Sequence, residues 1–282
     1  MGYWQAIFLG IIQGLTEFLP VSSSGHLVVF QRALNYDSGD PAMIFFTLIV
    51  HLGTVVAILV YYRRSVKRYV TGLSGCLSDL NQPVTLYRQS TPFRITVLAL
   101  AATFSTGIVF IFLKDTIESS FEKAPVVACC WIITATLLLI TDRNKQVKGS
   151  LKQFTLLAAL MIGLAQGAAL FPGISRSGST ICIALLFGLR RRWAGEFSYL
   201  IGVPAICAAT LIHGIKFFRE DHTAIDWGPM LVGGLASAIV GLAALALLIW
   251  AVKRAKLKFF AIYCYLIAIT TFIAYYGFDR LT

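Results

Sequence analysis

Pro20-Val21-Ser22-Ser23-Ser24-Gly25-His26 and Pro172-Gly173-Ile174-Ser175-Arg176-Ser177-Gly178-Ser179 are the two stretches of sequence that decide the fold. The first interrupts an apolar run over 3–34, and the second interrupts an apolar run over 153–189. The segment after the second break has about 12 residues and would reach only ~18 Å as a helix, whereas the hydrocarbon core of a bilayer is ~30 Å thick. We therefore predict that each run forms a re-entrant helix–loop–helix hairpin, which enters and leaves a membrane on one side.

The composition requires a lipid environment. Of the 282 residues, 57% are hydrophobic and only 13% are charged, whereas a soluble domain carries about 25% charged residues. Six further runs are long and apolar enough to span a bilayer. The sequence therefore predicts an all-α integral membrane protein with a single membrane domain over 1–282 and transmembrane spans at 42–62, 93–113, 124–141, 196–215, 228–252 and 259–276.

The positive charges gather at the edges of these spans. The net charge of +11 therefore indicates membrane topology, and we expect no nucleic-acid partner. The positive-inside rule places the basic loops in the cytoplasm, so that the first hairpin enters from outside and the second from the cytoplasm. The basic loops carry Arg63, Arg64, Lys67, Arg68, Arg88, Arg143, Lys145, Lys148, Lys152, Lys253, Arg254, Lys256 and Lys258, and the opposite loops carry Asp115, Glu118, Glu122, Glu220, Asp221 and Asp226.

The N-terminus and the cysteines indicate no processing and no metal centre. MGYWQAIFLG has no basic region and no cleavage site after it, so we expect no signal peptide. Ala6 stands where a myristoylation signal needs Ser or Thr. The six cysteines lie almost entirely within apolar segments and lack metal-ligand spacing, which favours packing roles for Cys76, Cys129, Cys130, Cys182, Cys207 and Cys264.

The two hairpins are copies of one another. An offset of 153 residues aligns them without a gap, with seven identities in the sixteen positions 10–25. Three spans separate the copies, and an odd number of spans reverses their direction in the membrane. The sequence therefore predicts an inverted-topology repeat whose broken helices meet near the midplane. The identical pairs are Gly10/Gly163, Gln13/Gln166, Gly14/Gly167, Phe18/Phe171, Ser22/Ser175, Ser24/Ser177 and Gly25/Gly178.

These loops suit an anion. Serines are favoured at helix N-caps, and a helix that begins there directs unpaired N–H groups at the loop. Gly25 and Gly178 would let the backbone approach a ligand closely. Arg176 adds a fork of donors that matches phosphate oxygens. We predict a pocket for a multiply charged anion between the two loops.

The first hairpin also carries groups for chemistry. Glu17 is its only carboxylate, Gln13 lies one helical turn earlier, and an acid at membrane depth is costly enough to suggest function. The alternative role for Glu17 is a structural ion pair with Arg176. His26, near the serines, is a candidate acid or base, although an isolated histidine is more often a satisfied core group. The context is weaker for His51, His213 and His222, and Glu196 either supports the second hairpin or sits at the membrane interface.

Two motifs resemble a known family. The sequence QGLTEFLPVSSSGH at 13–26 is similar to the (E/Q)xxxE plus PVSSxGH signature of the bacterial undecaprenyl-diphosphate phosphatases, the bacitracin-resistance family. The sequence PGISRSG at 172–178 resembles the PGxSRSG signature of that family. Glu196-Phe197-Ser198 and Pro204 also match its pattern. The resemblance covers essentially the whole chain.

The resemblance implies an enzyme that hydrolyses undecaprenyl diphosphate to the monophosphate and so recycles the lipid carrier for cell-wall synthesis. It further implies the bacterial cytoplasmic membrane, a site open to the extracytoplasmic side, and bacitracin as a competitor that sequesters the lipid diphosphate. The implied cofactor is Mg²⁺ or Ca²⁺, with Glu17 and Gln13 as candidate ligands, although the neutral amide of Gln13 favours phosphate oxygens and water as the main ligands. The implied catalytic residues are Ser23, His26, Glu17 and Arg176. From the chemistry of the loops we expect the phosphate to be bound by Ser22, Ser24, Gly25, Ser175, Ser177 and Gly178.

Three mechanisms are open from the sequence. Ser23 could attack the phosphorus, with His26 or Glu17 as the base. His26 could itself be the nucleophile, because imidazole forms phosphoramidates readily. Alternatively, water could attack directly. Arg176 stabilises charge on the transferred phosphoryl group in each case.

A transporter is the rival interpretation. Inverted repeats with broken helices are a transporter architecture, and a flippase for a phosphorylated lipid would use the same anion site. The combination of Ser, His, Glu and Arg favours a reaction over transport. A purely structural membrane protein would leave Glu17 and Arg176 unexplained. The length of the prenyl chain and the oligomeric state, including a homodimer, are open from the sequence, and membrane lipids are the expected surroundings.

Overall fold

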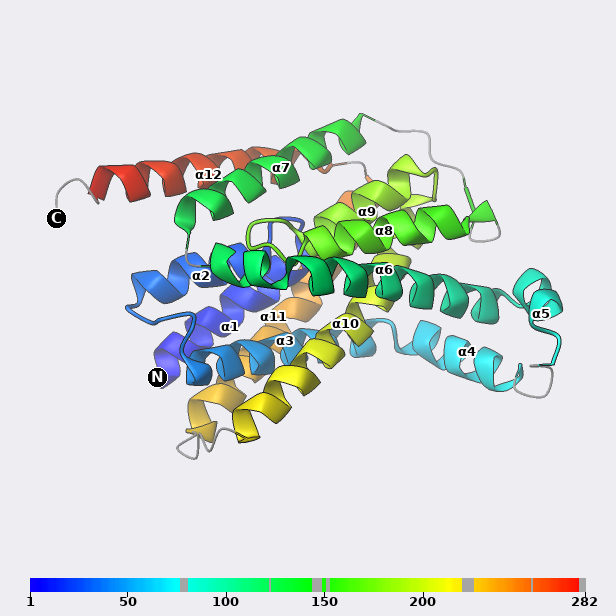
Figure 1. The fold of residues 1–282 in the computed structure, drawn as a ribbon, viewed down its shortest axis with the longest axis horizontal. Helices are drawn as coiled ribbons and strands as arrows, with labels where there is room; N and C mark the ends of the chain where they lie inside the picture. Colours follow the sequence, from blue (N-terminus) through cyan, green and yellow to red (C-terminus); the bar gives the residue numbers. More distant parts are fainter. Residues whose placement is uncertain are drawn as a thin grey trace.

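The computed structural model consists of helices (Figure 1). It describes residues 1–76, 81–121, 123–143, 149–150, 153–219, 226–254 and 256–278. The prediction of an all-α protein is confirmed for this part of the chain, where the one β-bridge joins Gly149 to Leu189. The helices are α1 Tyr3–Phe18, α2 Ser23–Ala33, α3 Pro41–Tyr61, α4 Arg63–Ser74, α5 Pro83–Gln89, α6 Thr91–Ser120, α7 Ala124–Asp142, α8 Leu156–Ala168, α9 Arg176–Leu186, α10 Arg191–Arg219, α11 Trp227–Lys253 and α12 Lys258–Phe278.

Six helices of the described residues are long and apolar enough to cross a membrane: α3, α6, α7, α10, α11 and α12. All six predicted spans are therefore confirmed, and the chain is a multi-pass membrane protein. The largest difference in bounds is in α6, which continues past the predicted end at residue 113 to Ser120. The extra turns are polar, and Lys114 lies 4.0 Å from Glu118 in an i,i+4 pair that stabilises a helix outside the apolar core.

Two short helices, α4 and α5, lie outside the predicted elements. α4 follows α3 directly and buries none of its residues, while four of its twelve residues are Lys or Arg. The basic residues alternate with Val66, Tyr69, Val70 and Leu73 at helical spacing. A short helix with one basic and one apolar face suits the surface of a bilayer. A search for long apolar runs does not detect such a helix, because basic residues interrupt its apolar residues.

The two predicted hairpins are the helix pairs α1/α2 and α8/α9. In Figure 1, α1 and α2 converge on the centre of the molecule from the left, and α8 and α9 converge on it from the right. Both second helices begin with a serine cap: the Ser22 Oγ accepts from the Gly25 N–H at 3.4 Å, and the Ser175 Oγ accepts from the Gly178 N–H at 3.1 Å. The helix breaks therefore occur at the Ser/Gly stretches, as the sequence predicts.

Each first hairpin helix packs on a long helix of the other half of the chain. α1 lies along α11, and α8 lies along α6. Glycines permit both approaches, because a Cβ on Gly10 would overlap the carbonyl of Gly233 and a Cβ on Gly163 would overlap that of Ala102. Close approach through small residues is a common way to pack membrane helices. The two halves therefore interlock, and the hairpin loops are held between them.

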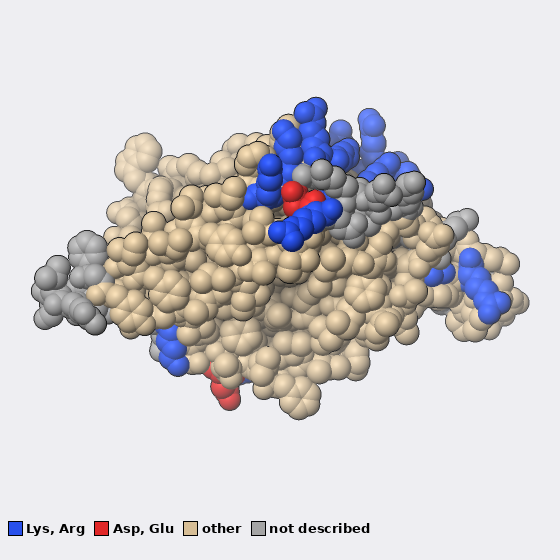
Figure 2. Space-filling model, turned by 90° about the horizontal axis from the view of Figure 1, so that it is seen from above, with Lys and Arg blue, Asp and Glu red and all other residues tan. Residues whose placement is uncertain are grey.

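The charges are unevenly distributed over the surface. In Figure 2 most visible Lys and Arg side chains gather along one edge, with a small acidic patch among them. The start of α4, the start of α10 and the C-terminal end of α11 carry Arg63, Arg64, Arg191, Arg192, Lys253 and Arg254. This segregation agrees with the basic loops lying on one side of a membrane. Of the charged and histidine residues used for the sequence predictions, Lys145, Lys148, Lys152, Glu122, Glu220, Asp221 and His222 lie outside the described residues.

We predict that Gly10→Val destabilises the protein, because its side chain would force α1 away from α11. Overpacking of this kind costs about 1–3 kcal/mol. The matched control is Gly107→Val, since a Cβ at Gly107 in α6 meets no atom within 4 Å. The measurement is the thermal unfolding midpoint of each purified variant in detergent. Equal midpoints for the two variants would contradict the packing described for α1 and α11.

Candidate active site

The carboxylate of Glu17 is the centre of the site. It lies in the last turn of α1, and its side chain is only 6% exposed. Arg176 Nη2 donates to Oε1 at 2.5 Å, while Ser23 Oγ and Gln13 Nε2 donate to Oε2 at 2.6 and 3.1 Å. His51 Nε2 lies 3.7 Å from the same Oε2. Each oxygen of this buried carboxylate therefore has a donor, and the net charge of the buried pair is neutral.

Arg176 comes from the opposite hairpin, where it is the first residue of α9. Its Nη1 donates to the Ser198 carbonyl at 3.4 Å, and its guanidinium carbon lies 5.8 Å from the centre of the Tyr199 ring. A Cβ at Gly202 would overlap the guanidinium, so α10 leaves space for it there. The side chain is thus fixed on one side by α10 and reaches Glu17 on the other.

Direct bonds join the two Ser/Gly loops. The Ser22 Oγ accepts from the Gly173 N–H at 3.0 Å, and the Ser177 Oγ donates to the Leu19 carbonyl at 3.3 Å. A Cβ on Gly25 would lie 2.8 Å from Cζ2 of Trp131 and 3.1 Å from the Gly173 nitrogen, so the glycine lets the two loops approach closely. A Cβ on Gly178 would similarly lie 3.2 Å from the Cβ of Pro20, the position 153 residues before Gly173. The loop contacts therefore follow the internal repeat.

Side chains of α7 support the loop backbone. Trp131 Nε1 donates to the Val21 carbonyl at 2.8 Å. Thr134 Oγ1 donates to the Gly173 carbonyl at 2.9 Å and accepts from the Ser175 N–H at 3.0 Å. Peptide groups in a loop inside an apolar environment need such partners, because lipid supplies none. Trp131 and Thr134 therefore hold the two loops in place, a role that the sequence alone did not reveal.

His26 lies apart from the carboxylate, on the second turn of α2. It is 1% exposed, its Nδ1 donates to the Ser22 carbonyl at 2.7 Å, and its Nε2 lies 2.7 Å from the Tyr263 hydroxyl. The ring stacks on Tyr263 and meets the edge of Trp131. Both ring nitrogens therefore have partners other than Ser23 and Glu17. This arrangement suits the alternative in which His26 is a satisfied core group.

His51 is the residue that sequence reasoning passed over. It lies in the middle of α3, and its Nδ1 donates to the Thr47 carbonyl at 2.7 Å, which directs Nε2 toward Glu17. Its side chain is 21% exposed, more than that of Glu17. A histidine within an apolar span is a signal of function in its own right. That signal was present in the sequence, but only the fold brings α3 beside the end of α1.

The remaining predicted residues surround this centre. Ser22 and Ser24 lie with their hydroxyl oxygens 3.3 Å apart, and those of Ser175 and Ser177 are 3.2 Å apart. α2 and α9 both begin at these serines, so the N-terminal ends of two helices meet at the loops. Helix N-termini attract anions. Arg176 and the two helix ends together can stabilise a phosphate, and Ser23 provides a nucleophilic oxygen.

The side chains that the structure describes do not form a cation site of their own. In the described part of the chain, no three His, Cys, Asp or Glu side chains lie close enough to share a metal ion. Glu17 is occupied by donors, and a cation at its oxygens would have to compete with Arg176. Gln13 Oε1 is buried and accepts no hydrogen bond from a described residue, but one neutral oxygen is too few for Mg²⁺ or Ca²⁺. A cation here would need its ligands from substrate and water.

Comparison with known proteins agrees with these features. A protein-family model described as bacitracin resistance protein BacA matches residues 6–270. The chain is 36% identical over 273 residues to an undecaprenyl-diphosphatase of Methanosphaera stadtmanae, which covers 95% of this chain and 96% of that protein. It is 37% identical over 281 residues to an undecaprenyl-diphosphatase of Alkalilimnicola ehrlichii, with 95% of each chain covered. These matches span almost the entire chain, and the protein therefore belongs to the bacitracin resistance protein BacA family.

Proposed function

We propose that this protein hydrolyses undecaprenyl diphosphate to undecaprenyl phosphate and inorganic phosphate. The relatives that align with this chain over nearly their full length are named undecaprenyl-diphosphatase. One observation carries the assignment: Ser23 and Arg176, from opposite hairpins, bond to the two oxygens of the buried Glu17 carboxylate. A nucleophile, a base and a phosphate-binding cation are thereby within reach of one phosphoryl group. The reaction recycles a lipid carrier for cell-wall synthesis.

In the first step, the terminal phosphate enters between the helix ends and binds the guanidinium of Arg176. Ser23 Oγ forms a bond to the terminal phosphorus, and its proton passes to Glu17 Oε2, 2.6 Å away. The anhydride P–O bond breaks, and undecaprenyl phosphate leaves with the bridging oxygen, to which Glu17 passes the proton and so becomes a carboxylate again. Arg176 and the backbone N–H groups at the starts of α2 and α9 stabilise the charge on the phosphoryl oxygens.

In the second step, the oxygen of a water attacks the phosphorus as Glu17 takes a proton from it. The bond between Ser23 Oγ and the phosphorus breaks, inorganic phosphate leaves, and Glu17 returns the proton to Ser23 Oγ. Glu17 is the base, and Gln13 Oε1, which accepts no hydrogen bond from a described residue, orients the water. His51 holds the carboxylate in place from the side of α3. Ser23 is favoured over His26 as nucleophile because both ring nitrogens of His26 already have partners. The proposal includes a divalent cation, Mg²⁺ or Ca²⁺, whose ligands would be oxygens of the diphosphate and of water.

The same proposal includes the arrangement in the membrane. The hairpins are re-entrant and form an inverted repeat in one membrane domain, with the site open to the extracytoplasmic side of the bacterial cytoplasmic membrane. Support comes from the convergence of the hairpins on the centre from opposite ends (Figure 1) and from contacts that repeat at an offset of 153 residues. The gathering of basic residues at one edge (Figure 2) supports the orientation. Bacitracin, which sequesters the substrate, is the expected competitor.

We predict that purified protein in detergent releases phosphate from a prenyl diphosphate, without a membrane gradient. Ser23→Ala and Arg176→Lys should each lower kcat/KM at least about 100-fold, because one removes the attacking oxygen and the other the bidentate fork. Ser119→Ala is the control, since that exposed hydroxyl in α6 bonds only the Thr116 carbonyl. Absence of turnover by an intact wild-type protein would favour the alternative, a transporter or flippase of a phosphorylated lipid.

We predict that turnover quenched with acid leaves a phosphate on the peptide that contains Ser23. The expectation rests on the Ser23–Glu17 bond, which positions the hydroxyl and receives its proton. Peptide mapping by mass spectrometry makes the measurement, with phosphoramidate-preserving conditions in a parallel sample. Phosphate on His26 would overturn the assignment of the nucleophile, and a site without phosphate would favour direct attack by water.

We predict that His51→Ala lowers kcat about tenfold, the rate change that corresponds to ~1.4 kcal/mol in the barrier, with little change in KM. The loss follows from the carboxylate being held less firmly once Nε2 is removed. His51→Gln, whose amide can still contact Glu17, should recover most of the rate. Steady-state kinetics with the same substrate decides this. An equal loss in His51→Gln, or a change confined to KM, would show that His51 has a different role.

A further inference from the structure

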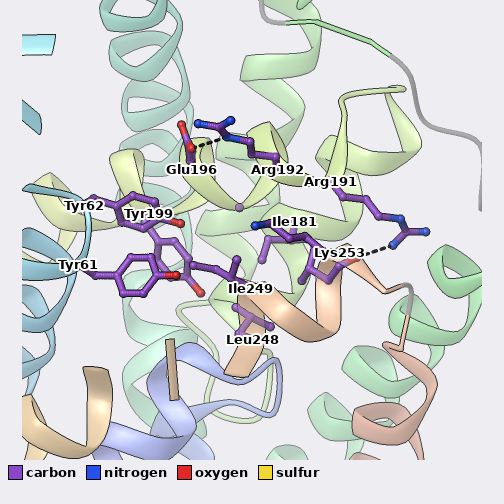
Figure 3. A pocket seen from close by; sticks show the side chains of 12 residues that line it. Tyr61, Tyr62, Ile181, Arg191, Arg192, Glu196, Tyr199, Leu248, Ile249 and Lys253 are labelled. Carbon is purple, nitrogen blue, oxygen red and sulfur yellow. Dashed lines mark hydrogen bonds and ion pairs between the residues drawn. The ribbon is translucent and has the colours of Figure 1, made fainter. Parts of the chain in front are cut away.

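A cavity lies at the basic end of the helices. Its volume is about 180 Å³, and it is formed where the end of α3, the start of α10 and the end of α11 come together, with Ile181 of α9 behind them (Figure 3). One water takes about 30 Å³ in the liquid, so this space holds a group several times larger than a water. The proposed reaction does not use this cavity, although Glu196, which the sequence analysis noted, lines it.

The cavity has an apolar floor and a charged rim. Its floor includes Ile181 and Leu248, which are 2% and 1% exposed, and Tyr199, which is 1% exposed. Its rim carries Arg192, whose side chain is 60% exposed, together with the exposed Lys253. Figure 3 shows Arg192 above the tyrosine rings and Lys253 beside Ile181, at about the level of the rings. A cavity of this kind fits a molecule with a polar head and an apolar body.

The charges at the rim are predominantly positive. Three cations, Arg191, Arg192 and Lys253, line the cavity with a single carboxylate, Glu196. Arg192 Nε donates to Glu196 Oε1 at 3.1 Å, and Arg191 Nη1 donates to the carbonyl of Val252 at 3.3 Å, next to Lys253 in the chain. Asp142 also acts on Arg191 electrostatically. Even when Asp142 is counted, three positive and two negative charges leave an excess of one cation, which favours an anion.

The position of the cavity narrows the class of ligand. Tyr61 and Tyr62 line it where the span α3 ends, and tyrosine is enriched at the level of lipid head groups. α10 begins and α11 ends at the same level, so the rim faces the boundary between lipid and water. Basic pockets between transmembrane helices at the cytoplasmic face bind the head groups of anionic lipids. A phosphate at the rim would place its lipid chains against the apolar side chains of the spans.

Tyr199 separates this cavity from the active site. Its hydroxyl donates to the Phe18 carbonyl at 3.5 Å, and its ring lines the cavity, with its centre 5.8 Å from the guanidinium carbon of Arg176. We propose that the cavity is a second phosphate site, which binds the head group of an anionic membrane lipid at the basic end of the helices. The site is distinct from the one that holds Glu17. Binding there does not depend on the proposed hydrolysis.

The test is a titration of the full-length protein in neutral detergent with phosphatidylglycerol, followed by native mass spectrometry. Phosphatidylcholine, which has no net charge, is the comparison lipid. We expect selective retention of the anionic lipid. Lys253→Ala should lower the affinity for phosphatidylglycerol about fivefold, in line with the contribution of one cation near a membrane surface. Glu196→Gln should tighten it, because that substitution removes the carboxylate from the rim.

The matched control is Lys258→Ala. Lys258 is exposed at the start of α12, near the Phe259 ring and outside the cavity, and its loss should leave binding unchanged. Equal weakening by Lys253→Ala and Lys258→Ala would mean general attraction to a basic surface and would overturn the site. Glu196→Gln binding phosphatidylglycerol no more tightly than the wild-type protein would also overturn the site. Binding of inorganic phosphate to the wild-type protein and to Lys253→Ala is measured by ³¹P NMR. If inorganic phosphate binds and Lys253→Ala weakens that binding, while phosphatidylglycerol does not bind, the ligand is a free anion and the lipid assignment fails.

Discussion

The two Ser/Gly loops break helices inside an apolar protein, and their peptide groups need hydrogen-bond partners that lipid cannot supply. The protein supplies them itself. Ser22 and Ser175 cap the helices that follow, Ser22 also accepts from the opposite loop, and Trp131 and Thr134 of α7 bond further peptide groups of the loops. These partners come from different segments, so the loops are stable only when the two halves of the chain are assembled.

The assembly of the two halves also pairs the buried charges of Glu17 and Arg176. A carboxylate or a guanidinium alone would be costly in the membrane interior, whereas a bonded pair is tolerated. Glu17 and Arg176 belong to opposite hairpins, and each neutralises the other only because the loops touch. The pair also serves the proposed binding function, since a phosphate can take the place of the carboxylate as the partner of Arg176. Structure and proposed chemistry thus depend on the same contact.

The helices and part of the site followed from local features. The six spans are visible as long apolar runs with at most one charged residue each, and the helix breaks are visible as Pro, Gly and Ser within two further apolar runs. Glu17 and Arg176 were identified by the same logic, as charged groups where charged groups are expensive, whereas Ser23 was singled out by the resemblance to a known family. α4 was missed because its apolar residues cover only one face. The partners of His26 were missed because Tyr263 is 237 positions away in the chain.

The sequence by itself determined the solvent, the number of spans, the position of the helix breaks and the kind of chemistry, because each depends on residue type and spacing along one segment. The tertiary structure decided which side chains meet. It placed His51 beside Glu17, turned His26 toward Tyr263, and formed the basic cavity from the ends of three helices. Such contacts depend on how helices remote in the chain pack against one another, and no local pattern of residues records that packing.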